Sequence, residues 1–225
     1  RAFYDHAKGL KLGLGLTSIS PVKIVLEKNL PIAAGIGGGS SDAAAVLLGL
    51  NDLWSVGLSR QNLAQFGLGL GADIPACVHQ TPCYVEGIGE KITSVKGLKE
   101  YPILLVNPLQ SLSTPAAFKA FHHLGSHFHQ SLTGGWADQF KADQKGFLKA
   151  QGNDLEAAAC HLVPEVAPLL KAINGQKGCW LSRMSGSGAT CFGLFDSPLE
   201  AKAAKENLSS LYPDYWLQEG VLHGA

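Results

Sequence analysis

Two stretches of the chain have the apolar pattern of β-strands. Residues 21–27, PVKIVLE, place Val22, Ile24 and Leu26 at every second position, which predicts a strand with one buried face. Residues 102–106, PILLV, form a continuous apolar run of strand length and predict a buried strand. Further strands are expected at residues 83–86 and 90–95, as a hairpin around a short glycine turn, and at 180–184, 189–195 and 215–222.

Apolar residues at helical spacing predict helices between these strands. Phe3, Ala7 and Leu10 form one stripe in residues 1–10, and residues 43–54 are apolar nearly all round, which favours a buried helix. The remaining helices are expected at residues 59–70, 114–121, 136–150, 155–173 and 197–211, the first two with Ser59 and Thr114 as N-caps.

The order of these elements determines the expected fold class. Helices and antiparallel strands follow one another without the strict alternation of a parallel α/β protein, so we expect an α+β fold. The composition changes after Val95, and we place a domain boundary near residue 100, which gives domains 1–100 and 101–225.

A glycine-rich loop at residues 31–44, PIAAGIGGGSSDAA, lies between a predicted strand and a predicted helix. Such a loop can turn several backbone N–H groups toward one point, and the helix N-terminus that follows favours a phosphate. No lysine follows Gly39, which excludes a Walker-type loop, and Ser40 occupies the place of the third glycine of a dinucleotide fingerprint. The alternative is a flexible turn with Ser40 as an ordinary helix cap.

Composition narrows the class of partner. The 225 residues are 46% hydrophobic and 16% charged, and 18 basic residues balance 18 acidic ones, so nothing indicates a nucleic acid or an anionic membrane. A small molecule is the expected partner. Five cysteines without a Cys-x-x-Cys pair fit a reduced cytoplasm, and no apolar run reaches the length of a membrane span. Four histidines, His122, His123, His127 and His129, are expected in a solvated loop and not in a metal site.

Two more motifs complete the set of candidate residues. In GADIP, residues 71–75, Asp73 is placed to cap a short helix with Pro75 in its first turn. In SGSG, residues 185–188, two glycines follow a predicted strand. Together with the loop at 31–44 and EGIGE at 86–90, these motifs resemble the GHMP kinases, the family of galactokinase, homoserine kinase and mevalonate kinase.

This resemblance implies a two-domain GHMP kinase fold, with an incomplete N-terminal ATP-binding domain and a ferredoxin-like C-terminal α/β sandwich. It implies transfer of the γ-phosphoryl group of ATP, with Mg²⁺ bound to the nucleotide, to a hydroxyl of a cytidine diphosphate-linked methylerythritol on the route to isoprenoid precursors. A homodimer is left open.

The resemblance also assigns roles to residues of this sequence. Asp73 matches the proposed catalytic base, and the loop at residues 185–188 would close over the reacting centre. The substrate side would include Thr114, Pro115 and Phe118, whose ring could stack on the cytosine. The nucleotide would be held by Lys28, Pro31, Ile32, Ala33, Ala34, Gly35, Ile36, Gly37, Gly38, Gly39, Ser40 and Ser41, and no residue is assigned as a metal ligand.

The start of the sequence departs from the family pattern. The only methionine is Met184, and neither the Ala-Lys-Leu-Asn-Leu-like strand nor the Gly-Tyr-His motif of the family is present. We therefore expect a piece of a longer kinase. Two alternatives stay open, namely a GHMP kinase for another small alcohol and an inactive remnant that still binds nucleotide.

Overall fold

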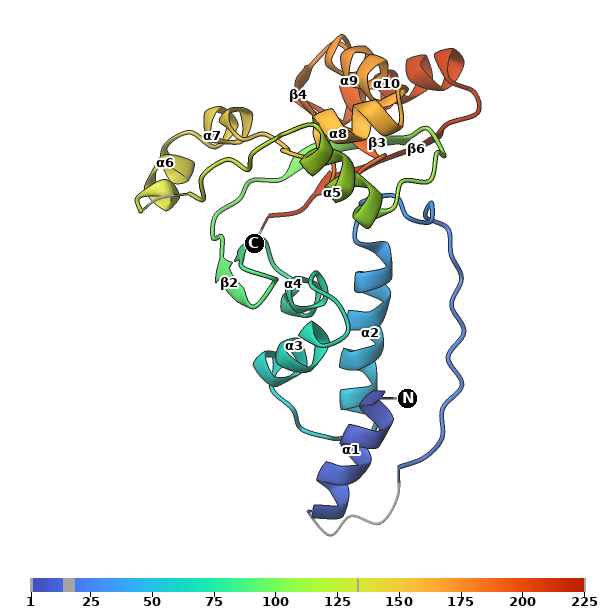
Figure 1. Ribbon diagram of the computed structural model, residues 1–225, viewed down its shortest axis with the longest axis vertical. Helices are drawn as coiled ribbons and strands as arrows, with labels where there is room; N and C mark the ends of the chain where they lie inside the picture. The colour runs from blue at the N-terminus through green and yellow to red at the C-terminus, as the bar shows by residue number, and fades with distance from the viewer. Residues whose placement is uncertain (1, 14–18, 133, 225) are drawn as a thin grey trace. The chain divides into compact units, whose positions relative to one another are not determined.

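The computed structural model describes residues 2–13, 19–132 and 134–224, which form two compact units (Figure 1). The first unit comprises residues 1–28 and 38–95, and the second comprises residues 29–37 and 96–225. The assignment of 1–100 and 101–225 as the two kinase domains stays a prediction.

The first unit is mainly helical. Its helices are α1 (Ala2–Gly13), α2 (Gly38–Leu53), α3 (Arg60–Leu68) and α4 (Ile74–His79), and its hairpin consists of β1 (Cys83–Glu86) and β2 (Lys91–Ser94). Phe3 of α1 stacks on Trp54 with ring centroids 6.2 Å apart, and Leu47, Leu63 and Val78 are buried around them. The predicted stripe on residues 1–10 therefore faces the core, although the side chain of Leu10 lies outside the described residues.

The predicted strand at residues 21–27 is wrong. This segment is neither helix nor strand, and its apolar side chains are solvent-exposed, with Val25 79% exposed and Ile24 55% exposed. An extended segment becomes a strand only when another strand satisfies its backbone groups, and in the described part of this unit the hairpin strands pair only with each other.

Helix α2 is also less buried than its composition predicts. Ala44, Leu47 and Asn51 are buried, whereas Leu53 is 64% exposed. The Asn51 side chain stabilises the turn that follows, because it accepts a hydrogen bond from the N–H of Leu58 and donates one to the carbonyl oxygen of Leu58. Helix α3 then begins with the predicted cap, as Ser59 accepts a hydrogen bond from the N–H of Asn62.

The second unit contains a four-stranded antiparallel sheet in the order β4-β5-β3-β6. Its strands are β3 (Tyr101–Asn107), β4 (Cys179–Met184), β5 (Cys191–Phe195) and β6 (Trp216–Leu222). Counted along the chain, this is a β-α-β-β-α-β arrangement with β3 in the interior of the sheet, the ferredoxin-like order that the family resemblance implies. Leu104 pairs with Gly193 on one side and with Glu219 on the other.

The helices of the second unit are α5 (Thr114–His123), α6 (Trp136–Ala142), α7 (Gln144–Ala150), α8 (Glu156–Leu162), α9 (Val166–Asn174) and α10 (Pro198–Leu211). Of these, α9 and α10 pack against the sheet (Figure 1). Leu104 and Val106 of β3 pack with Leu169 of α9 and Leu208 of α10 in the main core. The other face of the sheet has a smaller cluster in which Leu148 of α7 contacts residues such as Tyr101.

Two helices that the sequence predicts as continuous are each broken in two. Asp143 separates α6 from α7, and its side chain caps α7 by accepting a hydrogen bond from the N–H of Gly146. Pro164 lies in the break between α8 and α9, where a proline cannot donate the backbone hydrogen bond that a helix interior requires.

Candidate functional site

The loop from Pro31 to Gly37 belongs to the second unit and is neither helix nor strand. Ala33, Gly35 and Gly37 have φ values of +52°, +70° and +67°. This left-handed conformation is natural for glycine, but for Ala33 it costs about 1–3 kcal/mol. Strain of this kind persists only where the surrounding contacts hold it, and it is common in loops that bind ligands.

Contacts from the SGSG turn and from Thr190, two residues after it, hold this loop. The Ser185 hydroxyl donates to the carbonyl oxygen of Gly35 at 2.9 Å, and the N–H of Thr190 donates to that of Ala34 at 3.2 Å. The two glycine motifs, 150 residues apart in sequence, thus form one contact within the second unit.

Both sides of this contact require glycine. A methyl group on Gly35 would lie 2.6 Å from the carbonyl oxygens of Ser185 and Gly188, and one on Gly186 would lie 2.6 Å from the carbonyl oxygen of Gly35. The family resemblance implies that each motif lies near the reacting groups but does not imply that they touch, because a contact to a backbone carbonyl group leaves no signal in side-chain periodicity.

Residues 38–41 form the first turn of α2, in the first unit. The alternative in which Ser40 caps this helix is wrong, because the helix already begins at Gly38 and Ser40 lies inside it. A methyl group on Gly39 would meet no atom within 4 Å, so the backbone is uncovered there. The first-turn N–H groups have no partner within the helix and carry its positive dipole end, which suits an anion.

Lys28 and Asp42 form an ion pair at one side of α2. The Nζ–Oδ2 distance is 2.5 Å, and each side chain is 35% exposed. The carboxylate of Asp42 would repel phosphates, and the ion pair with Lys28 offsets its charge. The role of Lys28 toward a nucleotide stays a prediction.

Asp73 precedes α4, but its side chain does not cap the helix. The residue has φ −87° and ψ −13°, outside the extended conformation of a typical N-cap, and its carboxylate makes no capping hydrogen bond. The predicted cap is therefore wrong. The Asp73 carboxylate is exposed and makes no capping hydrogen bond to α4. A general base must be able to accept a proton from the substrate, and this arrangement meets that requirement.

The EGIGE turn fixes the backbone beside Asp73. Gly89 has φ +101°, and a methyl group on it would lie 2.0 Å from the carbonyl oxygen of Ala72. Only glycine allows the hairpin to come this close to the residue before Asp73. This contact explains why the GADIP and EGIGE motifs occur together in the sequence.

Thr114, Pro115 and Phe118 lie in the first two turns of α5. The cap of this helix is Ser113, which accepts a hydrogen bond from the N–H of Ala116, so the prediction of Thr114 as the cap is wrong. The Thr114 hydroxyl instead lies 2.9 Å from the hydroxyl of Ser187, in the SGSG turn. Pro115 is exposed, and the Phe118 side chain, one turn further along, is 38% exposed.

Asn153 and Asp154 connect two loops of the second unit. Asn153 Nδ2 donates to the carbonyl oxygens of Met184 and Gly186, at 2.9 and 2.8 Å. Asp154 accepts hydrogen bonds from the backbone N–H and the Nδ1 of His129. Burial would raise the pKa of the Asp154 carboxyl, but the hydrogen bonds from His129 outweigh it and hold that pKa below its ordinary value.

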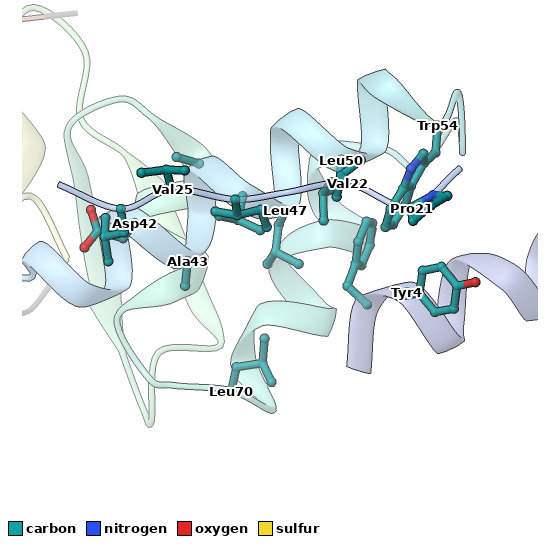
Figure 2. A pocket seen from close by; sticks show the side chains of 15 residues that line it. Tyr4, Pro21, Val22, Val25, Asp42, Ala43, Leu47, Leu50, Trp54 and Leu70 are labelled. Atoms are coloured by element: carbon teal, nitrogen blue, oxygen red, sulfur yellow. The ribbon is translucent and has the colours of Figure 1, made fainter. Parts of the chain in front are cut away.

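A groove of about 900 Å³ in the first unit lies apart from this chemistry. It runs between α2 and the extended segment at residues 21–26, with Pro21 near Trp54 at one end and Asp42 at the other (Figure 2). None of the predicted site residues lines it, and its walls are mostly apolar side chains such as Val22, Leu47 and Leu50.

Neither a metal cluster nor a membrane helix is found in the part of the chain that the structure describes. No three His, Cys, Asp or Glu side chains are grouped there so as to hold a metal ion. No helix among those residues combines the length and apolar character that a membrane crossing needs.

Comparison with protein families gives matches in both units. The model of the GHMP kinase N-terminal domain matches residues 3–81, and that of the GHMP kinase C-terminal domain matches residues 141–214.

Curated relatives match most of the chain. The 4-diphosphocytidyl-2-C-methyl-D-erythritol kinase of Rhizobium etli (strain CIAT 652) is 44% identical over 201 residues, covering 88% of this chain and 65% of the relative. The enzyme of that name from Gluconacetobacter diazotrophicus is 40% identical over 220 residues, covering 97% of this chain and 70% of the relative. The chain thus spans about two thirds of the length of these relatives.

Solved structures agree with this grouping. A crystal structure of 4-(cytidine 5′-diphospho)-2C-methyl-D-erythritol kinase matches with a TM-score of 0.72 and 29% identity, covering 98% of this chain and 78% of that one. A homoserine kinase from Cytophaga hutchinsonii matches with a TM-score of 0.69 at 16% identity, covering 88% of this chain and 68% of that one, a likeness of fold alone. The chain therefore belongs to the GHMP kinase family, among the 4-diphosphocytidyl-2-C-methyl-D-erythritol kinases.

Proposed function

We propose that this protein, as its natural full-length chain, transfers the γ-phosphoryl group of ATP to a hydroxyl of 4-diphosphocytidyl-2-C-methyl-D-erythritol. One observation carries the proposal beyond family membership. The loop at residues 31–37 is fixed against the SGSG turn, and the same turn contacts Thr114, on the helix to which the resemblance assigns the substrate. A phosphate-type loop and a substrate-side helix thus meet at one turn.

In this proposal the nucleotide phosphates bind to backbone N–H groups of residues 31–41. Phosphoryl transfer requires mainly positioning and charge neutralisation, so a glycine-rich backbone and a helix N-terminus suit it. Lys28 is the nearest basic residue in sequence and takes a nucleotide-side role. Its ion pair with Asp42 holds the ammonium group at the first turns of α2.

Mg²⁺ would be held together with the nucleotide. Its preferred ligands are oxygens, and here the exposed hydroxyl of Ser41 offers one beside the oxygens of the phosphates themselves. When bound, the ion neutralises charge on the transferred phosphoryl group.

Asp73 acts as the general base toward the substrate hydroxyl. Its carboxylate is exposed and makes no cap bond, and the Gly89–Ala72 contact fixes the backbone beside it. Thr114, Pro115 and Phe118 bind the cytidine diphosphate part of the substrate, with the Phe118 ring available for stacking. A homodimer and a cytoplasmic location stay predictions.

The test measures ATP-dependent ADP release by the full-length protein with four acceptors, namely 4-diphosphocytidyl-2-C-methyl-D-erythritol, homoserine, mevalonate and galactose. We expect turnover with the cytidyl acceptor alone, and a new phosphomonoester in its ³¹P NMR spectrum. Turnover with one of the other three would identify a kinase for another small alcohol. ATP binding without turnover of any acceptor would favour the inactive remnant.

A further inference from the structure

A buried polar pair lies at the end of strand β3. The Asn107 side chain donates through Nδ2 to the hydroxyl of Thr190 at 2.8 Å, and its Oδ1 accepts a hydrogen bond from the N–H of Leu109 at 2.7 Å. Asn107 is 2% exposed, and Thr190 is fully buried. An apolar pair of the same shape would be about as stable in such a place. What the polar pair adds is direction, because its hydrogen bond fixes one side chain against the other.

The backbone of Thr190 holds both hydrogen bonds to the predicted phosphate loop. Its N–H donates to the carbonyl oxygen of Ala34 at 3.2 Å. Its carbonyl oxygen accepts a hydrogen bond from the N–H of Ser185 at 2.8 Å. The hydroxyl of Ser185 in turn donates to the carbonyl oxygen of Gly35 at 2.9 Å. Both hydrogen bonds to the loop therefore depend on the position of Thr190, which Asn107 fixes.

These two hydrogen bonds also determine where two N–H groups of the loop point. In a trans peptide the C=O and N–H groups of one plane point in opposite directions. The carbonyl group of Ala34 shares its plane with the N–H of Gly35, and the carbonyl group of Gly35 shares its plane with the N–H of Ile36. Because Thr190 and Ser185 bind the carbonyl groups, the N–H groups point away from them. Among the described residues neither N–H has a protein acceptor, so both are available to an anion.

We propose that Asn107, acting through Thr190, is a positioning residue that directs N–H groups of the loop at residues 31–37 toward the phosphates of the nucleotide. The loop needs such a constraint, because Ala33 holds a φ of +52° that an unconstrained alanine leaves. When the constraint is lost, the apparent affinity falls with the fraction of molecules that keep the binding conformation. This inference rests on the proposed function, since it deepens the description of the nucleotide side of the same site.

The test compares KM for ATP and KM for the cytidyl substrate in variants of the full-length protein. Thr190→Val keeps the shape of the side chain but removes the hydroxyl that Asn107 binds, so KM for ATP rises about threefold to tenfold. Asn107→Ala has the same effect. KM for the cytidyl substrate stays within about twofold of wild type in both variants, because the hydrogen bond between Ser187 and Thr114 does not involve this pair.

Two further variants show that the pair acts as one unit. Thr190→Ser keeps the hydroxyl and keeps KM for ATP within about twofold of wild type. In the double variant Asn107→Ala/Thr190→Val, KM for ATP rises no further than in the single variants, because both substitutions remove the same hydrogen bond. Binding of ATP, measured by calorimetry, weakens by the same factors as KM, and urea unfolding shows whether each variant is folded.

Asn51→Ala is the matched control for a general loss of structure. Asn51 is also a buried amide side chain, and it makes two hydrogen bonds with Leu58 in the first unit, at the end of α2 far from its first turn. Its substitution destabilises the fold as the loss of a buried hydrogen-bonded group does, but KM for ATP stays within about twofold of wild type.

Folded Thr190→Val and Asn107→Ala variants with unchanged KM for ATP and unchanged ATP binding would overturn the inference, even if the wild type is an active kinase. Equal rises of the two KM values would also overturn it, and so would a rise of KM for ATP as large in Asn51→Ala. If the wild type binds ATP in a Thr190-dependent way but does not phosphorylate the cytidyl substrate, the inference stands and the proposed function fails.

Discussion

Strand β3 and the segment at residues 21–27 have similar apolar sequences, but only β3 is a strand. β3 forms hydrogen bonds with β5 on one edge and with β6 on the other, and Leu104 and Val106 are fully buried. The 21–27 segment is extended, but Ile24 and Val25 are mostly exposed. The difference shows that an apolar pattern marks a stretch that can form a strand, whereas the presence of a pairing edge decides whether it does.

The loop at residues 31–37 is an intermediate case. It has no strand partner, but Ser185 and Thr190 bind two of its carbonyl groups. It is fixed by these specific contacts and by the burial of Ala34, which is 5% exposed, whereas Ile32 is 81% exposed. The three stretches therefore differ in the contacts that fix their backbones. Substitutions in each should lower the free energy of unfolding by different amounts.

Leu104→Ala should have the largest effect on stability. The substitution opens a cavity at a fully buried position in the interior of the sheet, so we expect the free energy of unfolding to fall by about 2–5 kcal/mol. Urea denaturation of the 225-residue chain, followed by circular dichroism, measures this change. A decrease in the free energy of unfolding of less than about 1 kcal/mol would mean that β3 is not the centre of this core.

Gly35→Ala should have an intermediate effect. Its methyl group would lie 2.6 Å from two carbonyl oxygens, at a φ of +70°, so we expect a loss of about 1–3 kcal/mol together with weaker ATP binding. The matched control is Gly49→Ala, inside α2, where a methyl group meets no atom within 4 Å and should stabilise the helix by up to about 1 kcal/mol. Equal stability of the two variants would contradict the backbone contact between the glycine motifs.

Val25→Ser should have the smallest effect. The side chain is 79% exposed, so in the 225-residue chain we expect the free energy of unfolding to change by no more than about 0.5 kcal/mol. The same urea titration measures it. A loss above about 1 kcal/mol would show that this segment is packed in solution and that the comparison with β3 fails.

The local pattern predicted most helices and the hairpin, because these depend on periodicity and on turn residues, whereas the ferredoxin-like order of the second sheet came from the resemblance to the GHMP kinases. It did not predict the helix breaks at Asp143 and Pro164, because the helical spacing of apolar residues continues through both positions. The helix ends at Asp143 because this side chain caps the next helix, and it ends near Pro164 because proline has no backbone N–H to donate. The sequence analysis also made Asp73 and Thr114 helix caps, and the structure contradicts both. Ser113 supplies the cap in place of Thr114, and the backbone of Asp73 is not in the cap conformation.

Other features of the candidate site could be predicted only in part. Family motifs identified the glycine loop and the SGSG turn, but the contact between them joins the Ser185 hydroxyl to a backbone carbonyl oxygen 150 residues away. The Asn153 bridge and the Asp154–His129 pair join polar side chains to groups far away in sequence, and no local spacing predicts such pairs.

The most direct test of the account is the Asp73→Asn variant of the full-length protein, with Asp52→Asn as an exposed carboxylate control in the same unit. Loss of a general base lowers kcat by about 100-fold or more, so we expect that loss in Asp73→Asn with ATP binding within about twofold of wild type. Asp52→Asn should retain wild-type turnover of the cytidyl substrate. Near-normal turnover in Asp73→Asn would contradict the assignment of Asp73 as the base.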